Sequence, residues 1–421
     1  MYKINHFTVI LELRMVRKHN FREWVTDNCL IIFMVLTFAS FAYNVPGIFR
    51  VILWVLIVFA NLRYCKVKSM MDALIVAYVA GAFLSLTGMF FRPYPIEFFY
   101  KVFVDSYIPI IFYFIGKHSD NQLQTRFYNR SLIAILFVYI IGFYYAITMP
   151  SWYVQKTVEI ANLHSSYTED TIMYARFSSF LDSYHVANLG VFALCISFGM
   201  LKTEDKGINR LLGYISLGVV IVAVLLSQQR VAMFVGGALF IYYLFKSSKN
   251  KTTILGILGV LIILIFSIPL IIDNTLVSEV LARLSGESRS VMVSGRIHQW
   301  IEALTGSMEP VFGNGIGSGG HIAIEHGWHP AIADGSYFKI WLEGGMYSTV
   351  LFLIILIASL WSAFVNRNTC YVEFPILLFF TCSLIGANII DMPYIIAPMW
   401  YAIGRVNKFD RIKLAKYEHK M

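Results

Sequence analysis

Residues 346–366 read MYSTVLFLIILIASLWSAFVN, and no charged side chain occurs among them. A helix needs about 20 mainly apolar residues to cross a bilayer, so this stretch predicts a membrane span. Lipid offers backbone groups no outside partners, so every such span is expected to be helical. The same pattern predicts further spans at residues 28–45, 47–62, 70–91, 98–116, 131–149, 184–201, 210–227, 230–245, 253–272, 372–390 and 393–404. The sequence therefore predicts an all-α, polytopic membrane protein of about 12 transmembrane helices.

The composition of the whole chain agrees with a membrane location. Of its 421 residues, 58% are hydrophobic and 14% are charged, and the mean hydropathy is +0.65. An average soluble domain is about 45–50% apolar and about 25% charged. These values exclude a soluble globular protein, and they exclude a disordered chain as well. The formal charge is +9, but Lys and Arg occur mostly in short clusters between apolar stretches, so no nucleic acid partner is expected.

The basic residues predict how the chain is oriented in the membrane. Lys and Arg concentrate in alternate connections if both termini, 1–27 and 405–421, are cytoplasmic, as the positive-inside rule requires. The chain then forms a single integral membrane domain with two long external loops, 150–183 and 273–345. Loops longer than about 12–15 residues usually carry function or structure of their own. We therefore expect the chemistry in the larger loop.

Glycines are spaced regularly in the larger loop, at Gly313, Gly315 and Gly317. Such a stretch can bring free backbone N–H groups close to an anionic oxygen. A flexible surface loop is the alternative, because glycine triplets are common and the spacing of a P-loop is absent.

Two histidines and a carboxylate follow the glycines. His326 and His329 could be catalytic groups, ligands or ordinary loop histidines, and Asp334 lies close in sequence. Because His and a carboxylate together can act as an acid–base pair, we regard these three residues as candidate catalytic groups. The sequence has no Asp-x-Asp, CxxC or Cys/His cluster. It therefore predicts neither a metal site nor a cofactor.

Arginines on the external side are rare, and three of them lie near the expected level of the lipid. Arg230 begins a predicted span, while Arg176 and Arg296 lie in the two external loops. Guanidinium binds phosphate in a two-pronged fashion, so a lipid-linked pyrophosphate is a candidate partner. The alternative for Arg230 is an arginine at a helix end that extends to the interface.

Two helical patterns give structural predictions. Lys101 and Asp105 are four residues apart in the fourth span and are expected to neutralise one another inside the bundle. Residues 296–304 form a short amphipathic helix whose expected apolar face consists of Ile297, Trp300, Ile301 and Leu304.

The order of these motifs resembles that of the O-antigen polymerase and O-antigen ligase superfamily of bacterial inner membranes. The resemblance covers residues 175–350 best, and the remainder only through hydropathy and length. Its elements are Arg176-Phe177 through Ala187-Asn188, Leu226 through Ala232, Gly295-Arg296 with Trp300, Ala303-Leu304, Pro310 and the three glycines, and Asp334-x-x-Tyr337 through Glu343 and Gly345.

One departure favours a polymerase over a ligase. In the ligases the closing motif usually begins with His-Asn, and that His is thought to be the catalytic base. Asp334 stands at this position here, while His329 and His326 lie earlier in the chain. The base is therefore left open between Asp334 and His329.

The resemblance implies a GT-C-like fold whose active site faces the periplasm. The implied reaction is a metal-independent, inverting transfer of a growing glycan from undecaprenyl pyrophosphate onto a lipid-linked repeat unit. Arg230, Arg296 and Arg176 would hold the diphosphate, with the N–H groups of the glycine stretch assisting. Implied partners are the lipid-linked glycan, membrane lipid and a polysaccharide chain-length regulator.

Three alternatives remain open. An O-antigen ligase would transfer the polymer to a lipid A–core acceptor. A flippase for lipid-linked oligosaccharides, or another transporter, would be expected to place charges deep in several spans and to keep its external loops short. A non-catalytic scaffold would need no clustered arginines.

Overall fold

The computed structural model describes residues 21–156, 177, 179–181, 183–203, 208–227, 229–247, 289–306, 309–332 and 334–418. Within these ranges the chain is helical and contains no β-strand. The helices are α2 (Phe21–Tyr43), α3 (Ile48–Asn61), α4 (Met70–Leu84), α5 (Ile96–Val102), α6 (Ile111–His118), α7 (Asn121–Thr148), α10 (Ser183–Thr203), α11 (Ile208–Ser227), α12 (Arg230–Ser247), α15 (Arg289–Thr305), α16 (His321–Glu325), α17 (Ser336–Val365), α18 (Glu373–Gly386) and α19 (Pro393–Glu418).

Seven helices among the described residues are long and apolar enough to cross a membrane, which confirms the all-α, polytopic prediction. The predicted span 253–272 and most of the loop 150–183 lie outside the described residues, and the total of about 12 spans stays a prediction. The seven are Phe21–Tyr43, Met70–Phe90, Ile96–His118, Asn121–Thr148, His185–Lys202, Arg210–Ser227 and Ser336–Val365, with shorter apolar helices at Val231–Leu244 and Glu373–Gly386.

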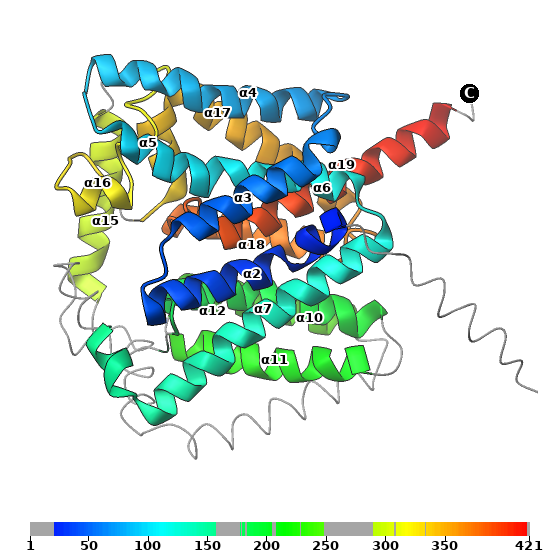
Figure 1. The fold of residues 1–421 in the computed structure, drawn as a ribbon. Coiled ribbons are helices and arrows are strands. Elements are labelled where there is room, and N and C mark those ends of the chain that lie inside the picture. Colours follow the sequence, from blue (N-terminus) through cyan, green and yellow to red (C-terminus); the bar gives the residue numbers. More distant parts are fainter. Residues whose placement is uncertain are drawn as a thin grey trace, which may run out of the picture.

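The helices lie side by side in one bundle (Figure 1). The described part of the larger loop, with α15 and α16, lies across one end of this bundle, which we call the capped end. The C-terminal half of α19 projects from the other end, which we call the open end. Helix α15 packs on the first part of α17 through Trp300, whose ring stacks on Phe338 with centroids 4.8 Å apart.

Buried ion pairs hold the helices together at the open end. The carboxylate of Asp72 near the start of α4 pairs with Lys117 at the end of α6, and both side chains are buried. Arg405 of α19 lies 3.8 Å from Glu373 of α18 and donates a 2.7 Å hydrogen bond to the carbonyl of Ser119. Charges buried this deeply are retained only when they are paired.

Helix α17 changes direction at Gly345, whose φ of 64° and ψ of −166° are not helical. Positive φ favours glycine, and no side chain would fit here, because a Cβ would meet the backbone of Gly313 and Val311. The kink separates a first segment, Ser336 to Gly344, from the long apolar segment that the sequence predicts as a span beginning at residue 346.

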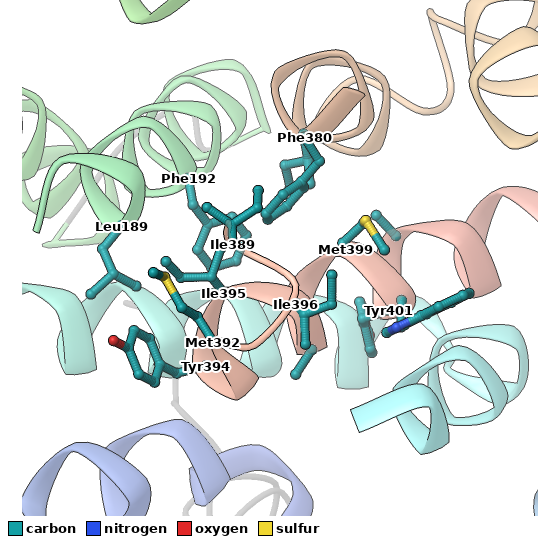
Figure 2. Packing of buried hydrophobic residues seen from close by; sticks show 14 of the residues in the cluster. Leu189, Phe192, Phe380, Ile389, Met392, Tyr394, Ile395, Ile396, Met399 and Tyr401 are labelled. Carbon is teal, nitrogen blue, oxygen red and sulfur yellow. The ribbon is translucent and has the colours of Figure 1, made fainter. Parts of the chain in front are cut away.

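A break in helical structure, residues 387–392 between α18 and α19, is buried inside the bundle. Figure 2 shows Ile389, Ile395 and Ile396 packed among side chains of neighbouring helices, Phe192 and Phe380 among them. Irregular backbone is tolerated at membrane depth only where protein satisfies its polar groups. Most of the polar side chains of the candidate site lie around this break.

Candidate functional site

A lysine and two carboxylates form an ionic cluster beneath the capped end. The ammonium group of Lys339 lies 2.9 Å from Oε2 of Glu343 and 2.6 Å from Oδ1 of Asp391. The side chains of Lys339 and Glu343 are each only 2% exposed. Lys339 and Glu343 are one helical turn apart on the first segment of α17, and Asp391 comes from the break before α19. We refer to these three residues as the ionic cluster.

Neutral polar groups complete the hydrogen bonding of the carboxylates. Asp391 accepts a 2.8 Å hydrogen bond from the hydroxyl of Ser106 and one of 3.3 Å from the amide of Asn388. Glu343 accepts a 3.2 Å hydrogen bond from the backbone N–H of Gly319. The ionic cluster therefore joins four segments of the chain: the first segment of α17, the span Ile96–His118, the loop at Gly319 just after the glycine stretch, and the break before α19.

Ser336 fixes the break against the start of α17. Its hydroxyl donates to the carbonyl of Ala387 at 2.7 Å and accepts from the N–H of Ile389 at 3.1 Å. The backbone N–H of Ser336 also donates to Ala387, at 3.1 Å. One buried serine thus satisfies irregular backbone on both sides of Asn388, and this holds Asp391 opposite Lys339.

A π-helical turn, Phe103–Tyr107, brings two further polar residues to the ionic cluster from the span Ile96–His118. Ser106 contacts Asp391 directly, as described above, and Asp105 lies within electrostatic range of both Asp391 and Lys339. π-Helical turns are rare in proteins, and those that occur are often found at functional sites. Ionisable residues at membrane depth are also costly and usually functional.

The predicted pairing of Lys101 with Asp105 is wrong. Lys101 is exposed, and no ion pair links it to Asp105 in the described part of the span. Asp105 instead interacts with Arg50 of α3, as well as with the ionic cluster. The physical reason is the π-helical turn, which widens the helix so that residues four apart no longer lie above one another.

The glycine stretch is buried, and its backbone groups are used within the protein. The N–H of Gly313 donates to Glu309 O at 2.7 Å, and that of Gly315 donates to Glu343 O at 2.9 Å. The prediction that this stretch offers free N–H donors is therefore wrong for Gly313 and Gly315, whose N–H groups are bonded within the protein. The third glycine, Gly317, packs so closely that a Cβ would lie 2.6 Å from the carbonyl oxygen of Phe98.

The glycines allow the loop to lie directly on the ionic cluster. Gly313 has a φ of 79°, and a Cβ there would collide with the backbone of Glu343. A Cβ on Gly320 would collide with the Cε of Lys339 and lie 3.4 Å from Oε1 of Glu343. The regular glycine spacing therefore does mark a place where the backbone approaches another group closely, but that group is α17.

The structure places the three candidate catalytic groups in the larger loop near its surface. His326 is exposed, its Nδ1 lies 2.9 Å from Ile322 O, and its ring packs 4.6 Å from that of Phe98. The side chain of His329 is exposed, and Asp334 is half-buried just before α17. The catalytic roles of these three residues stay predictions.

Arg92, in the connection between the third and fourth predicted spans, is a site residue that the sequence reasoning missed. It is 9% exposed, its guanidinium lies 5.4 Å from the ring centroid of Trp328, and its Nη2 donates to the carbonyl of His329. Its buried Nη1 makes no hydrogen bond within the structure as described, and neither does the buried hydroxyl of Tyr94, which lies against Gly315. Burial lowers the pKa of the Arg92 guanidinium and raises that of the Tyr94 hydroxyl.

The signal for Arg92 is present in the sequence. The positive-inside rule makes external arginines rare, but only Arg176, Arg230 and Arg296 were predicted from it as site residues. Of those, Arg176 lies outside the described residues. Arg230 begins α12 and Arg296 lies within α15, but their side chains are also outside the described part. Phosphate binding by these three stays a prediction.

Helix α15 confirms that the predicted amphipathic segment is helical, but most of its apolar side chains are not buried. Ile297, Ile301 and Leu304 are 47%, 55% and 50% exposed, whereas Trp300 is half-buried against Phe338 and Ala303 is fully buried. The exposed apolar stripe runs along a helix that lies across the end of the bundle (Figure 1). This is the form of a helix that lies in the plane of a membrane interface.

Comparison of the chain with protein-family models and with curated proteins finds no match.

Proposed function

We propose that the chain is a polymerase of lipid-linked surface polysaccharide in the bacterial inner membrane. It would transfer a growing glycan from undecaprenyl pyrophosphate onto a lipid-linked repeat unit, with its site facing the periplasm. One observation carries the proposal. The two motifs of the larger loop, the glycine stretch and the segment from Asp334 to Gly345, are packed together over a buried ionic cluster.

The chemistry needs cations at the donor and a base at the acceptor. A hydroxyl of the acceptor sugar attacks the anomeric carbon, and the bond from that carbon to the diphosphate oxygen breaks. The diphosphate leaves on its lipid with the bonding electron pair, and the hydroxyl proton passes to a base, Asp334 or His329. Direct displacement inverts the anomeric configuration. The leaving diphosphate is stabilised by positive charge, the proposed role of Arg230, Arg296 and Arg176.

Arg92 is a further candidate for the diphosphate. It is held against Trp328 and His329 of the larger loop, and one of its nitrogens lacks a hydrogen bond within the described residues. An arginine orients a phosphate through paired N–H donors and remains charged at physiological pH. The polyprenyl chain of the substrate must enter the site from the lipid, and the exposed apolar stripe of α15 offers an apolar surface along which it could lie.

The ionic cluster has a positioning role in this proposal. The carboxylate of Glu343 binds the N–H of Gly319 and the ammonium of Lys339, and its backbone carbonyl accepts from Gly315, so Glu343 ties the glycine stretch to the first segment of α17. Lys339 in turn holds Asp391 at the break before α19. A site whose supporting contacts are fixed in this way loses no free energy to reorganisation during the reaction.

Purified protein reconstituted with an undecaprenyl-pyrophosphate-linked repeat unit tests the proposal. The wild-type chain is expected to give a ladder of polymer, and Arg92→Gln, Arg230→Ala, Arg296→Ala and Asp334→Ala to slow its formation by about 10²–10³-fold. Arg63→Ala, an exposed arginine outside the site, is the control and should leave the ladder unchanged. Wild-type chain lengths in all four site variants would remove the site assignment.

A deletion strain separates the proposed polymerase from the alternative functions. Loss of a polymerase leaves single repeats attached to the core, and loss of a ligase leaves long chains on the carrier lipid. Loss of a flippase traps repeat units on the cytoplasmic side. The last two outcomes would each replace the proposal by the named alternative.

A further inference from the structure

Three basic side chains gather at the open end of the bundle, far from the candidate site. Lys202 lies in the last turn of α10, Lys246 lies near the end of α12, and Arg367 lies in the connection after α17. The ammonium groups of Lys202 and Lys246 lie 3.7 and 4.9 Å from the centroid of the same ring, that of Tyr371. Lys246 also donates a 3.1 Å hydrogen bond to the carbonyl of Arg367. We call these three cations the basic cluster.

No carboxylate compensates the basic cluster within the described part of the chain. Among the described residues, Lys246 donates hydrogen bonds to two neutral oxygens, those of Tyr242 at 2.9 Å and of the Arg367 backbone. The nearby Glu373 is buried and lies 3.8 Å from Arg405 instead. Cations on aromatic rings gain some energy from the ring face, but three like charges held together repel one another. A bound anion would relieve this repulsion.

The surface beside the basic cluster is apolar and suits a lipid. The guanidinium of Arg367 lies 4.9 Å from the ring centroid of Phe364 on the last turn of α17. Phe364 is 43% exposed, and Val365 and Trp361 next to it are 56% and 66% exposed. Tryptophan is enriched at the interface between lipid and water. A charged headgroup at the basic cluster would thus place its acyl chains along exposed apolar side chains.

We propose that the basic cluster binds the phosphate of an anionic phospholipid in the leaflet at the open end. Lys202 and Arg367 are exposed and can reach a headgroup, and the buried ring of Tyr371 lies beneath the ammonium groups of Lys202 and Lys246. Anionic headgroups attract Lys and Arg near the membrane surface, by about fivefold in affinity for each charge. This site is independent of the proposed polymerase reaction.

The test uses the full chain in nanodiscs of phosphatidylcholine with increasing phosphatidylglycerol. Native mass spectrometry counts the phosphatidylglycerol molecules that the protein retains. Thermal melts measure the midpoint temperature of unfolding. The triple variant Lys202→Gln, Lys246→Gln, Arg367→Gln is expected to lose on the order of 100-fold in apparent affinity and most of the rise in midpoint. The matched control is Arg63→Gln, Lys66→Gln, Lys68→Gln, which removes three exposed cations from another connection and should retain wild-type binding.

A second arm separates the lipid from soluble phosphate. Inorganic phosphate added to nanodiscs of pure phosphatidylcholine should leave the midpoint of the wild-type chain unchanged. The same rise with inorganic phosphate would reassign the cluster to a soluble anion and overturn the lipid proposal. Equal phosphatidylglycerol retention in the wild type, the triple variant and the control would show that the attraction is unspecific, which would also overturn it.

Discussion

Replacing Lys339 by methionine is expected to destabilise the protein strongly. The methionine keeps most of the volume but leaves Glu343 and Asp391 without the cation between them, in a position where the lysine is only 2% exposed. Removing one partner of a buried ion pair costs about 3–5 kcal/mol. With an unfolding entropy of about 2.1 cal/mol/K per residue, a chain of 421 residues should melt roughly 3–6 °C lower.

The assay is a thermal melt of purified protein in detergent, followed by near-ultraviolet circular dichroism. Lys101→Met is the matched control, because Lys101 is exposed on the same kind of apolar helix and has no ion pair to Asp105 in the described span. Its midpoint should stay within about 1 °C of wild type, since surface substitutions usually change stability by less than about 0.5 kcal/mol.

A triple variant separates charge from packing. Lys339→Met combined with Glu343→Gln and Asp391→Asn removes every charge of the ionic cluster, so no carboxylate is left buried without a cation, and such an uncompensated charge is the main cost of the single variant. The triple variant should therefore recover a large part of the lost stability. A Lys339→Met protein that melts like wild type, or a triple variant that melts lower than the single one, would refute the reasoning.

Two further predictions concern the backbone around the ionic cluster, and each is checked by the same melts. Gly313→Ala should lower the free energy of unfolding by roughly 2–5 kcal/mol, because φ is positive and the new Cβ meets backbone that cannot move aside. Gly327→Ala also has positive φ but lies in open space, and it should lower the free energy of unfolding by about 1–2 kcal/mol. Equal losses in the two variants would contradict the packing argument. Ser336→Ala should cost about 1–3 kcal/mol, because it leaves the buried N–H of Ile389 without its acceptor. Thr87→Ala, which removes an exposed hydroxyl bonded within its own helix, should change little, and a similar loss in both variants would argue against a special role for Ser336.

Local sequence patterns predicted most of the helices, because a span is determined by some 20 neighbouring residues and needs no tertiary information. The long apolar segment after Gly345 is the clearest case, and its predicted start coincides with the kink. The caps of two helices are equally local: Ser69 accepts from the N–H of Asp72, and Asp120 from that of Leu123. Such signals lie within a few residues of each other.

The candidate site was predicted less well, because its contacts join segments far apart in the chain. Lys339 and Asp391 are separated by 52 positions, and Arg92 and His329 by 237. Neither pair leaves a pattern in the intervening sequence. The pairing of Lys101 with Asp105 failed for another reason, since no simple periodicity announces a π-helical turn.

The glycine stretch shows that one residue pattern supports two physical readings. Glycine permits a backbone to approach either an anion or another backbone. At Gly313 and Gly315 the structure shows the second, with both N–H groups bonded within the protein. Choosing between them required the position of α17, which begins only at Ser336 and could not be inferred from glycine spacing.

The proposed function requires that the larger loop be exposed on the periplasmic side of the membrane, and cysteine labelling in intact cells measures this directly. Of the chain's five cysteines, Cys65 is exposed and lies in a connection predicted to be cytoplasmic. His298 of α15 has a side chain that is 74% exposed. In a Cys65→Ser background, His298→Cys should react with a membrane-impermeant maleimide once the outer membrane is opened, whereas native Cys65 should react only after the inner membrane is permeabilised. Labelling of Cys65 in intact spheroplasts with protection of His298→Cys would place the loop in the cytoplasm and contradict the proposed function.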